Sequence, residues 1–146
     1  MPEPIPSATV KTMLDTYWNA SNVTEPTHID INDGNTGAQL RFDLRNADYI
    51  FIAVETPALD EEPIGTWVYG NRRSVVVCEI HTKQNRQRLY DLMAEVRRVC
   101  HARMHSETSY QRVQFMGFTE YTDVQLNLWA GRVQIELVNS AILLET

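Results

Sequence analysis

The sequence predicts an α+β fold: a single domain over residues 1–146 in which two main helices pack on a mostly antiparallel sheet. Two stretches repeat apolar residues with the period of a helix, one near the N-terminus and one after the middle of the chain. Around them lie runs of strand length, several of which alternate apolar and polar residues. Strands in runs with helices placed among them favour an α+β architecture, here in the order α-β-β-β-β-α-β-β.

The N-terminal third predicts one helix and two short strands. The first helix should begin at Ser7, as its capping residue, and continue to about Ala20. Its apolar residues share one stripe at spacings of three and four: Val10, Met13, Leu14, Tyr17 and Trp18. The turn-rich segment that follows should carry a strand at His28–Ile31 and another near Gln39–Leu44.

The middle of the chain predicts strands separated by a loop. Tyr49–Val54 is a continuous apolar run, which indicates a strand covered on both faces. The segment Thr56–Gly65 has two prolines and three consecutive acids, so we expect an exposed loop there. Strand structure should resume at Trp67–Tyr69, and Ser74–His81 should be the next full strand.

The second main helix should follow that strand directly. Thr82 or Asn85 can cap it, and its pattern continues to about Met104. Its apolar face is formed by Leu89, Leu92, Met93, Val96, Val99 and Cys100. Such a stripe, leading straight out of a strand, predicts a helix that folds back onto the sheet.

Two more strands should complete the sheet. Tyr110–Thr122 alternates, which places Val113, Phe115 and Tyr121 on one side. Arg132–Asn139 also alternates. Its inward residues should be Val133, Ile135 and Leu137.

Composition is that of an ordinary globular chain of 16.8 kDa, with 43% hydrophobic and 22% charged residues. The two cysteines, Cys78 and Cys100, lie in apolar patterns and should be buried free thiols, as in a reducing compartment. No signal peptide is visible, and no window approaches the ~20 apolar residues of a membrane span. We therefore expect synthesis in the cytoplasm and no membrane partner.

Charge is unevenly distributed along the chain. Residues 1–66 carry 11 acidic and 3 basic side chains, whereas residues 67–146 carry 8 acidic and 10 basic ones. Eleven of the 13 basic residues are arginine, which suits bidentate contacts at interfaces. This polarity suits subunits that meet through a basic face on an acidic face.

The end of the second helix carries residues that could ligate a metal ion. His101 and His105 are separated by four residues, which puts two ligands on one helical face, and Cys100 lies beside them. No glutamate of an HExxH motif stands between them, and imidazoles near a helix C-terminus also complement its dipole. We expect helix-end chemistry here, and no metal or cofactor. The segment Asp30–Gly37 is expected to be a turn, because a calcium loop in register from Asp30 would place Arg41 where glutamate is required.

The sequence predicts no enzyme. It lacks GxSxG, GxGxxG and GxxxxGK[ST], and neither cysteine lies in a nucleophile motif. An alternative is a nucleic-acid-binding domain that uses the basic helix 83–104, because residues 72–112 hold 9 basic and 4 acidic side chains. A pI near 5.1 argues against nucleic acid as the main ligand.

Four segments resemble the core of a known family. They read RSVVVCEIHT, NRQRLYDLMAEVRRVC, YQRVQFMGFTEYTD and WAGRVQIELVNSA, and ADYIFIAVETP and the opening helix fit the same order. Together they resemble the tail terminator (tail completion) proteins of long-tailed viruses of bacteria and archaea. The resemblance is one of element order and spacing, and it carries no catalytic signature.

The resemblance implies a structural virion protein at the junction of tail and neck. Such a subunit would form a ring, typically a homo-hexamer, that caps the tail tube protein and meets the head-side connector protein. Genomic DNA would pass through its channel without specific binding. From the charge distribution, the interface candidates are the acids Asp60, Glu61 and Glu62 and the arginines Arg97, Arg98 and Arg103.

Overall fold

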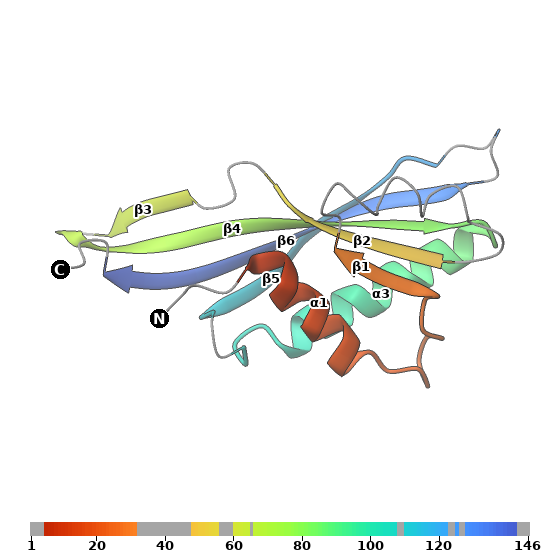
Figure 1. Ribbon diagram of the computed structural model, residues 1–146, viewed down its shortest axis with the longest axis horizontal. Helices are drawn as coiled ribbons and strands as arrows, with labels where there is room; N and C mark the ends of the chain where they lie inside the picture. Colours follow the sequence, from red (N-terminus) through yellow and green to blue (C-terminus); the bar gives the residue numbers. More distant parts are fainter. Residues whose placement is uncertain are drawn as a thin grey trace.

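The computed structural model describes residues 5–31, 48–55, 60–64, 66–107, 110–122, 125 and 128–142. The fold is α+β, as predicted, with two helices and a mostly antiparallel sheet among the described residues (Figure 1). In chain order the elements are α1 (Pro6–Tyr17), β1 (His28–Ile31), β2 (Asp48–Val54), β3 (Asp60–Ile64), β4 (Thr66–Thr82), α3 (Arg86–Ala102), β5 (Arg112–Glu120) and β6 (Trp129–Ile142). The predicted strand near Gln39–Leu44 lies outside the described residues.

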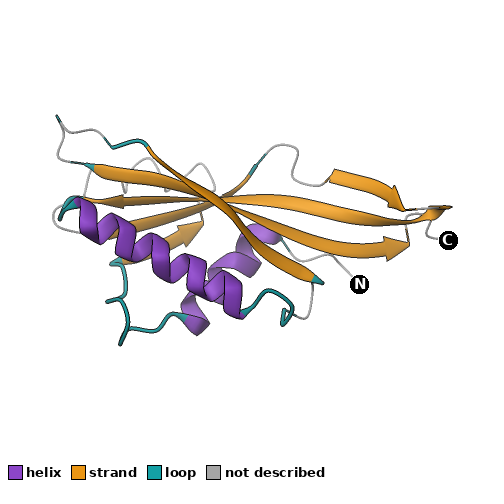
Figure 2. Ribbon diagram, turned by 180° about the vertical axis from the view of Figure 1, so that it is seen from behind, coloured by secondary structure: helices purple, strands orange, loops and turns teal. Residues whose placement is uncertain are grey.

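The sheet runs in the order β1-β2-β4-β6-β5, and β3 pairs with the other end of β4. Strands β1 and β2 are parallel, and every other described pair is antiparallel. Both helices lie on the same face of this sheet (Figures 1 and 2). Their apolar stripes meet the inward residues of β2, β4, β5 and β6 in one core, which also contains both cysteines.

The helix starts illustrate two ways to begin a helix. Asn85 caps α3 as predicted, because its side chain accepts a hydrogen bond of 2.7 Å from the N–H of Arg88. The predicted cap at Ser7 is wrong: Ile5 is the cap residue of α1 and no side chain caps it. Pro6 begins the helix, where its missing N–H removes a donor that would have no helical partner. Ser7 is instead buried in the first turn.

Two charge networks hold the helices in place. The Arg88 guanidinium bonds the Asp48 carboxylate at 2.8 and 3.0 Å, which ties α3 to the start of β2, and it also donates to the carbonyl of Thr24. Farther along α3, Glu95 accepts from the N–H of Asn19 at 2.7 Å while Arg98 donates to the carbonyl of Tyr17 at 2.8 Å. The second network therefore satisfies backbone groups just where α1 ends.

A bulge in β5 changes which side chains face the core. Val113 is buried and Phe115 packs against the core, as predicted. The register of β5 against β6 then shifts between Phe115 and Gly117, and Phe118 takes the next inward position. The prediction for Tyr121 is wrong as a result: its ring is 44% exposed and contacts His81 on the opposite face.

A long β extension projects beyond the helices. The predicted loop at Thr56–Gly65 is wrong over Asp60–Ile64, which form strand β3 and pair with β4 from Asp60 opposite Arg73 onward. On its other side the same part of β4 pairs with the end of β6, as far as Tyr69 opposite Ile142. Figure 1 shows β3, β4 and β6 reaching well past α1 and α3. We call this three-stranded part of the sheet the arm. None of the described helices is long and apolar enough to cross a bilayer.

Candidate functional site

The face of the sheet opposite the helices is the main candidate for function, and we call it the open face. Strand alternation sends Ile50 and Ile52 of β2 to the core and Tyr49 and Phe51 to the open face. The pairing registers then align one residue from each of five strands in a transverse row on this face: Asp30, Phe51, Glu79, Arg132 and Thr119. Charged side chains thus occupy β4 and β6 in this row, beside the buried Phe51 ring of β2.

Aromatic rings form a chain across one end of the open face. The His28 and Tyr49 rings stack at 4.6 Å, and Tyr49 and Phe51 stack at 5.4 Å. His81 meets Phe51 edge-on at 5.8 Å and Tyr121 at 6.0 Å. Tyr49 and Phe51 are buried, with Leu128 packed against them. Their ring faces are therefore not available as a platform on which bases could stack.

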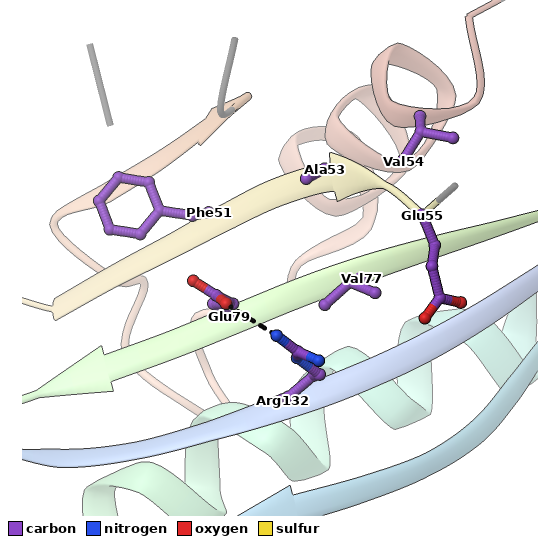
Figure 3. A pocket seen from close by; sticks show the side chains of 7 residues that line it. All are labelled: Phe51, Ala53, Val54, Glu55, Val77, Glu79 and Arg132. Atoms are coloured by element: carbon purple, nitrogen blue, oxygen red, sulfur yellow. Dashed lines mark hydrogen bonds and ion pairs between the residues drawn. The ribbon is translucent and has the colours of Figure 1, made fainter. Parts of the chain in front are cut away.

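Beside these rings lies a hollow of about 190 Å³ (Figure 3). Its apolar lining comes from Phe51, Ala53, Val54 and Val77. Its polar lining consists of Glu55, Glu79 and Arg132, and Figure 3 shows Glu79 and Arg132 joined across β4 and β6. We call it the Glu55–Glu79 hollow. A second hollow of about 350 Å³ lies on the β5 side and shares Arg132 with the first.

The electrostatics of the Glu55–Glu79 hollow favour a cation. Arg132 donates to Glu79 at 3.3 Å, and the His81 ring nitrogen Nε2 lies 3.9 Å from the same carboxyl group. The His81 imidazole, with Arg132, holds the pKa of Glu79 below its usual range, so this group is a carboxylate at neutral pH. Among the described residues, two carboxylates face one guanidinium, which leaves one negative charge in the lining.

His81 is a buried polar residue on this face. Its Nε2 lies 3.2 Å from the Tyr121 hydroxyl, while its Nδ1 has no hydrogen-bond partner among the described residues. His81 and Cys78 lie three residues apart on β4, so strand alternation sends Cys78 to the core and His81 to the open face. This separation removes the imidazole as a base for that thiol, whose pKa burial raises.

Toward the arm, the open face carries a three-strand charge ladder. Glu136 of β6 is buried between Arg112 of β5, at 2.7 Å, and Arg73 of β4, at 3.4 Å. Each arginine side chain is about half exposed, with 44% for Arg112 and 48% for Arg73. Opposite charges on neighbouring strands stabilise the pairing and leave a surface that is polar without being strongly of one sign.

The predicted interface residues fall on two separate elements. Asp60, Glu61 and Glu62 lie on β3, in the arm. Of the predicted arginines, Arg98 is bound to Glu95 at 2.6 Å, and Arg103 is bound to Glu107 at 3.1 Å. Arg103 also lies 4.2 Å above the centre of the Tyr17 ring, so its contacts are within the chain. Arg97 is exposed and has no partner among the described residues.

The histidines considered for metal binding lie on either side of the end of α3. His101 is in its last turn and meets Phe115 edge-on at 6.4 Å. His105 lies beyond the helix, which ends at Ala102, and its Nδ1 is 3.2 Å from the carbonyl of Gln111. The spacing of four residues therefore does not place them on one helical face. Within the described part of the chain, no three His, Cys, Asp or Glu side chains are grouped to hold a metal ion.

Sequence reasoning missed the hollow and the charge ladder. Glu79 interrupts the apolar run of Ser74–His81, and this was an available signal. Arg132 and Glu136 hold the ordinary polar positions of an alternating strand, so nothing in the sequence singled them out. Comparison with models of known protein families finds no match, and comparison with curated proteins finds none either.

Proposed function

We propose that this protein is a structural virion subunit: a ring-forming tail terminator that caps the tail tube and joins it to the head-side connector. The resemblance of its strand–helix–strand–strand core to that family is one support. The observation that carries the proposal is the open face, where the central strands present paired charges and a hollow with an unbalanced carboxylate. A sheet face of this kind suits contact with another polar protein surface, since interfaces between subunits combine apolar contacts with complementary charges.

The arm is the second support. It carries paired strands beyond the helices, and it bears the acids Asp60, Glu61 and Glu62 on an edge strand. Acidic residues and a proline on an edge strand oppose uncontrolled strand pairing, and a protein that must assemble in one defined way needs such protection. In the proposed ring the arm is available to reach a neighbour or the tail tube, while genomic DNA passes through the channel without specific binding.

The nucleic-acid alternative finds less support in the basic helix. Arg86, Arg88, Arg98 and Arg103 are all paired with carboxylates of the same chain. Phosphate binding would have to replace these pairs, which reduces the gain from each contact.

Native mass tests the proposal. Light scattering over a wide range of protein concentrations should find a particle of roughly 100 kDa, six times the subunit mass of 16.8 kDa. Electron micrographs of that particle should show a ring with a central hole. A monomer at every concentration would contradict a ring that the subunit forms by itself. If such a monomer is retained on DNA at low salt, and if Arg97→Glu abolishes this retention, the nucleic-acid-binding alternative would be favoured.

A further inference from the structure

The flank of α3 beside β5 carries an exposed cation that no described residue pairs with. Arg97 is exposed and has no partner among the described residues, whereas four other arginines of the same region are paired. Tyr90 and His101 lie seven residues before it and four after it, so the three side chains share one helical strip. Tyr90 is 39% exposed and His101 is also exposed. An arginine flanked by rings is the residue combination that protein interfaces favour.

The Glu55–Glu79 hollow has the complementary character. Glu55 is exposed and has no side-chain partner among the described residues, and Glu79 is shared with Arg132. A volume of about 190 Å³ is several times the ~30 Å³ share of one water molecule, so the hollow has room for a side chain. Ala53 and Val77 offer apolar surface to the methylene groups of an arginine, while the carboxylates can accept from its planar guanidinium.

The two surfaces are different patches of the subunit. The strip that contains Arg97 runs along the flank of α3 beside β5, because Tyr90 meets Phe118 and His101 meets Phe115. The hollow lies on the other face of the sheet, and Figure 3 shows its side chains with the helices behind the strands. A contact between them joins different patches of two copies, so it is heterologous and repeats from subunit to subunit until the ring closes.

We propose that Arg97 of one copy enters the Glu55–Glu79 hollow of the next copy and forms the repeating contact of the ring. This inference rests on the proposed ring and names the surfaces that build it. Glu55 and Arg97, which have no partner among the described residues of their own copy, would then pair with each other across the contact.

Charge reversal on each side tests the contact. Arg97→Glu and Glu55→Arg should each weaken self-association at least about tenfold, because close charge pairs at interfaces couple strongly. The double variant, in which the charges are exchanged, should regain the mass of the wild type. Lys83→Glu is the matched control, since Lys83 is also exposed and without a partner among the described residues, and it should leave the mass unchanged. Thermal unfolding of each variant checks that the subunit is still folded.

A mixture of the two single variants gives the sharpest readout. When the two are mixed in equal amounts, an alternating ring has the wild-type charge pair at one contact and the exchanged pair at the next. Both contacts are attractive, so the ring should re-form. A wild-type ring whose mass is unaffected by Arg97→Glu would overturn this contact and leave the proposed ring standing. Loss of association in the single variants without recovery in the mixture or the double variant would also overturn it. A wild-type monomer at every concentration would remove the proposed ring and this contact together.

Discussion

Glu95 is a nearly fully buried carboxylate whose charge holds the end of α1. Burial alone would raise the pKa of Glu95, but the Arg98 guanidinium and the Asn19 N–H outweigh it and lower the pKa below the ordinary 4.5. A lowered pKa in the folded state stabilises the fold fully above pH 4.5, and this contribution is lost as the pH falls through the folded pKa.

We therefore expect Glu95→Gln to be less stable than the wild type at pH 7 and the difference between them to shrink below pH 4.5. Urea unfolding at a series of pH values measures this. Asp91→Asn is the matched control on the same helix, because Asp91 is partly exposed and bonds only Gln87 among the described residues. A difference between Glu95→Gln and wild type that stays constant from pH 7 to pH 3 would contradict the assigned role of the charge.

Arg88 and Asp48 form the more deeply buried pair, with side chains 12% and 3% exposed. Arg88→Met should cost about 3–5 kcal/mol of unfolding free energy, because it leaves the Asp48 charge buried without its partner. Arg97→Met on the exposed side of the same helix should stay within about 0.5 kcal/mol of the wild type. Denaturant unfolding compares the two, and equal midpoints would show that the buried pair does not matter to stability.

At the scale of elements, strands β5 and β6 pack tightly at Gly131. A Cβ built there would lie 2.3 Å from two ring carbons of Phe118 and 3.3 Å from the carbonyl of Thr119, so the ring would have to move. Gly131→Ala should therefore destabilise the fold by about 1–3 kcal/mol.

Gly117 supplies the control, since a Cβ there meets nothing within 4 Å. Gly117→Ala should be much milder than Gly131→Ala in the same unfolding measurement. If Phe118 is the obstacle, Phe118→Leu should recover part of the loss caused by Gly131→Ala. Equal effects of the two alanine substitutions would contradict this account of the packing.

The elements that the sequence predicted well are those whose patterns are local. Helix α3, its cap at Asn85 and the inward residues of β6 follow from spacing alone. Strand β3 was missed because Pro63 and the three acids before it are residues typical of a loop. The segment is a strand because it pairs with β4, and this pairing cannot be read from the local sequence. Tyr121 was misplaced because a one-residue bulge reverses every later side chain, and Gly117, which lies at the bulge, was the signal that could have marked it.

The hollow was beyond sequence reasoning for a related reason. Glu55, Glu79 and Arg132 come from three strands, and their meeting depends on the registers of β2 with β4 and of β4 with β6. Of the predicted interface arginines, Arg98 and Arg103 have carboxylate partners three and four residues away, so helical spacing could have marked both as paired within the chain. Helical spacing could show that Arg97 faces outward, but not that it lacks a partner.

For the whole molecule, a ring held by charge contacts should respond to salt. Raising ionic strength from 0.1 M to 1 M shortens the screening length from about 10 Å to 3 Å, so attraction between partly exposed charges weakens. We expect sedimentation equilibrium to show that the protein concentration at which the oligomer dissociates is higher in 1 M salt than in 0.1 M salt. An oligomer that is unchanged or strengthened by salt would mean that apolar contacts dominate its interfaces.

Strand β4 belongs to both parts of the molecule. Its 17 residues span roughly 55 Å, whereas the 17 residues of α3 span about 25 Å. From Tyr69 to Thr82 it pairs with β6 without a register shift, so no hinge separates the arm from the body. The arm is therefore a stiff continuation of the strand that crosses the core, and not a separately hinged flap. A force applied at its tip would be transmitted to the core through an unbroken ladder of hydrogen bonds between β4 and β6.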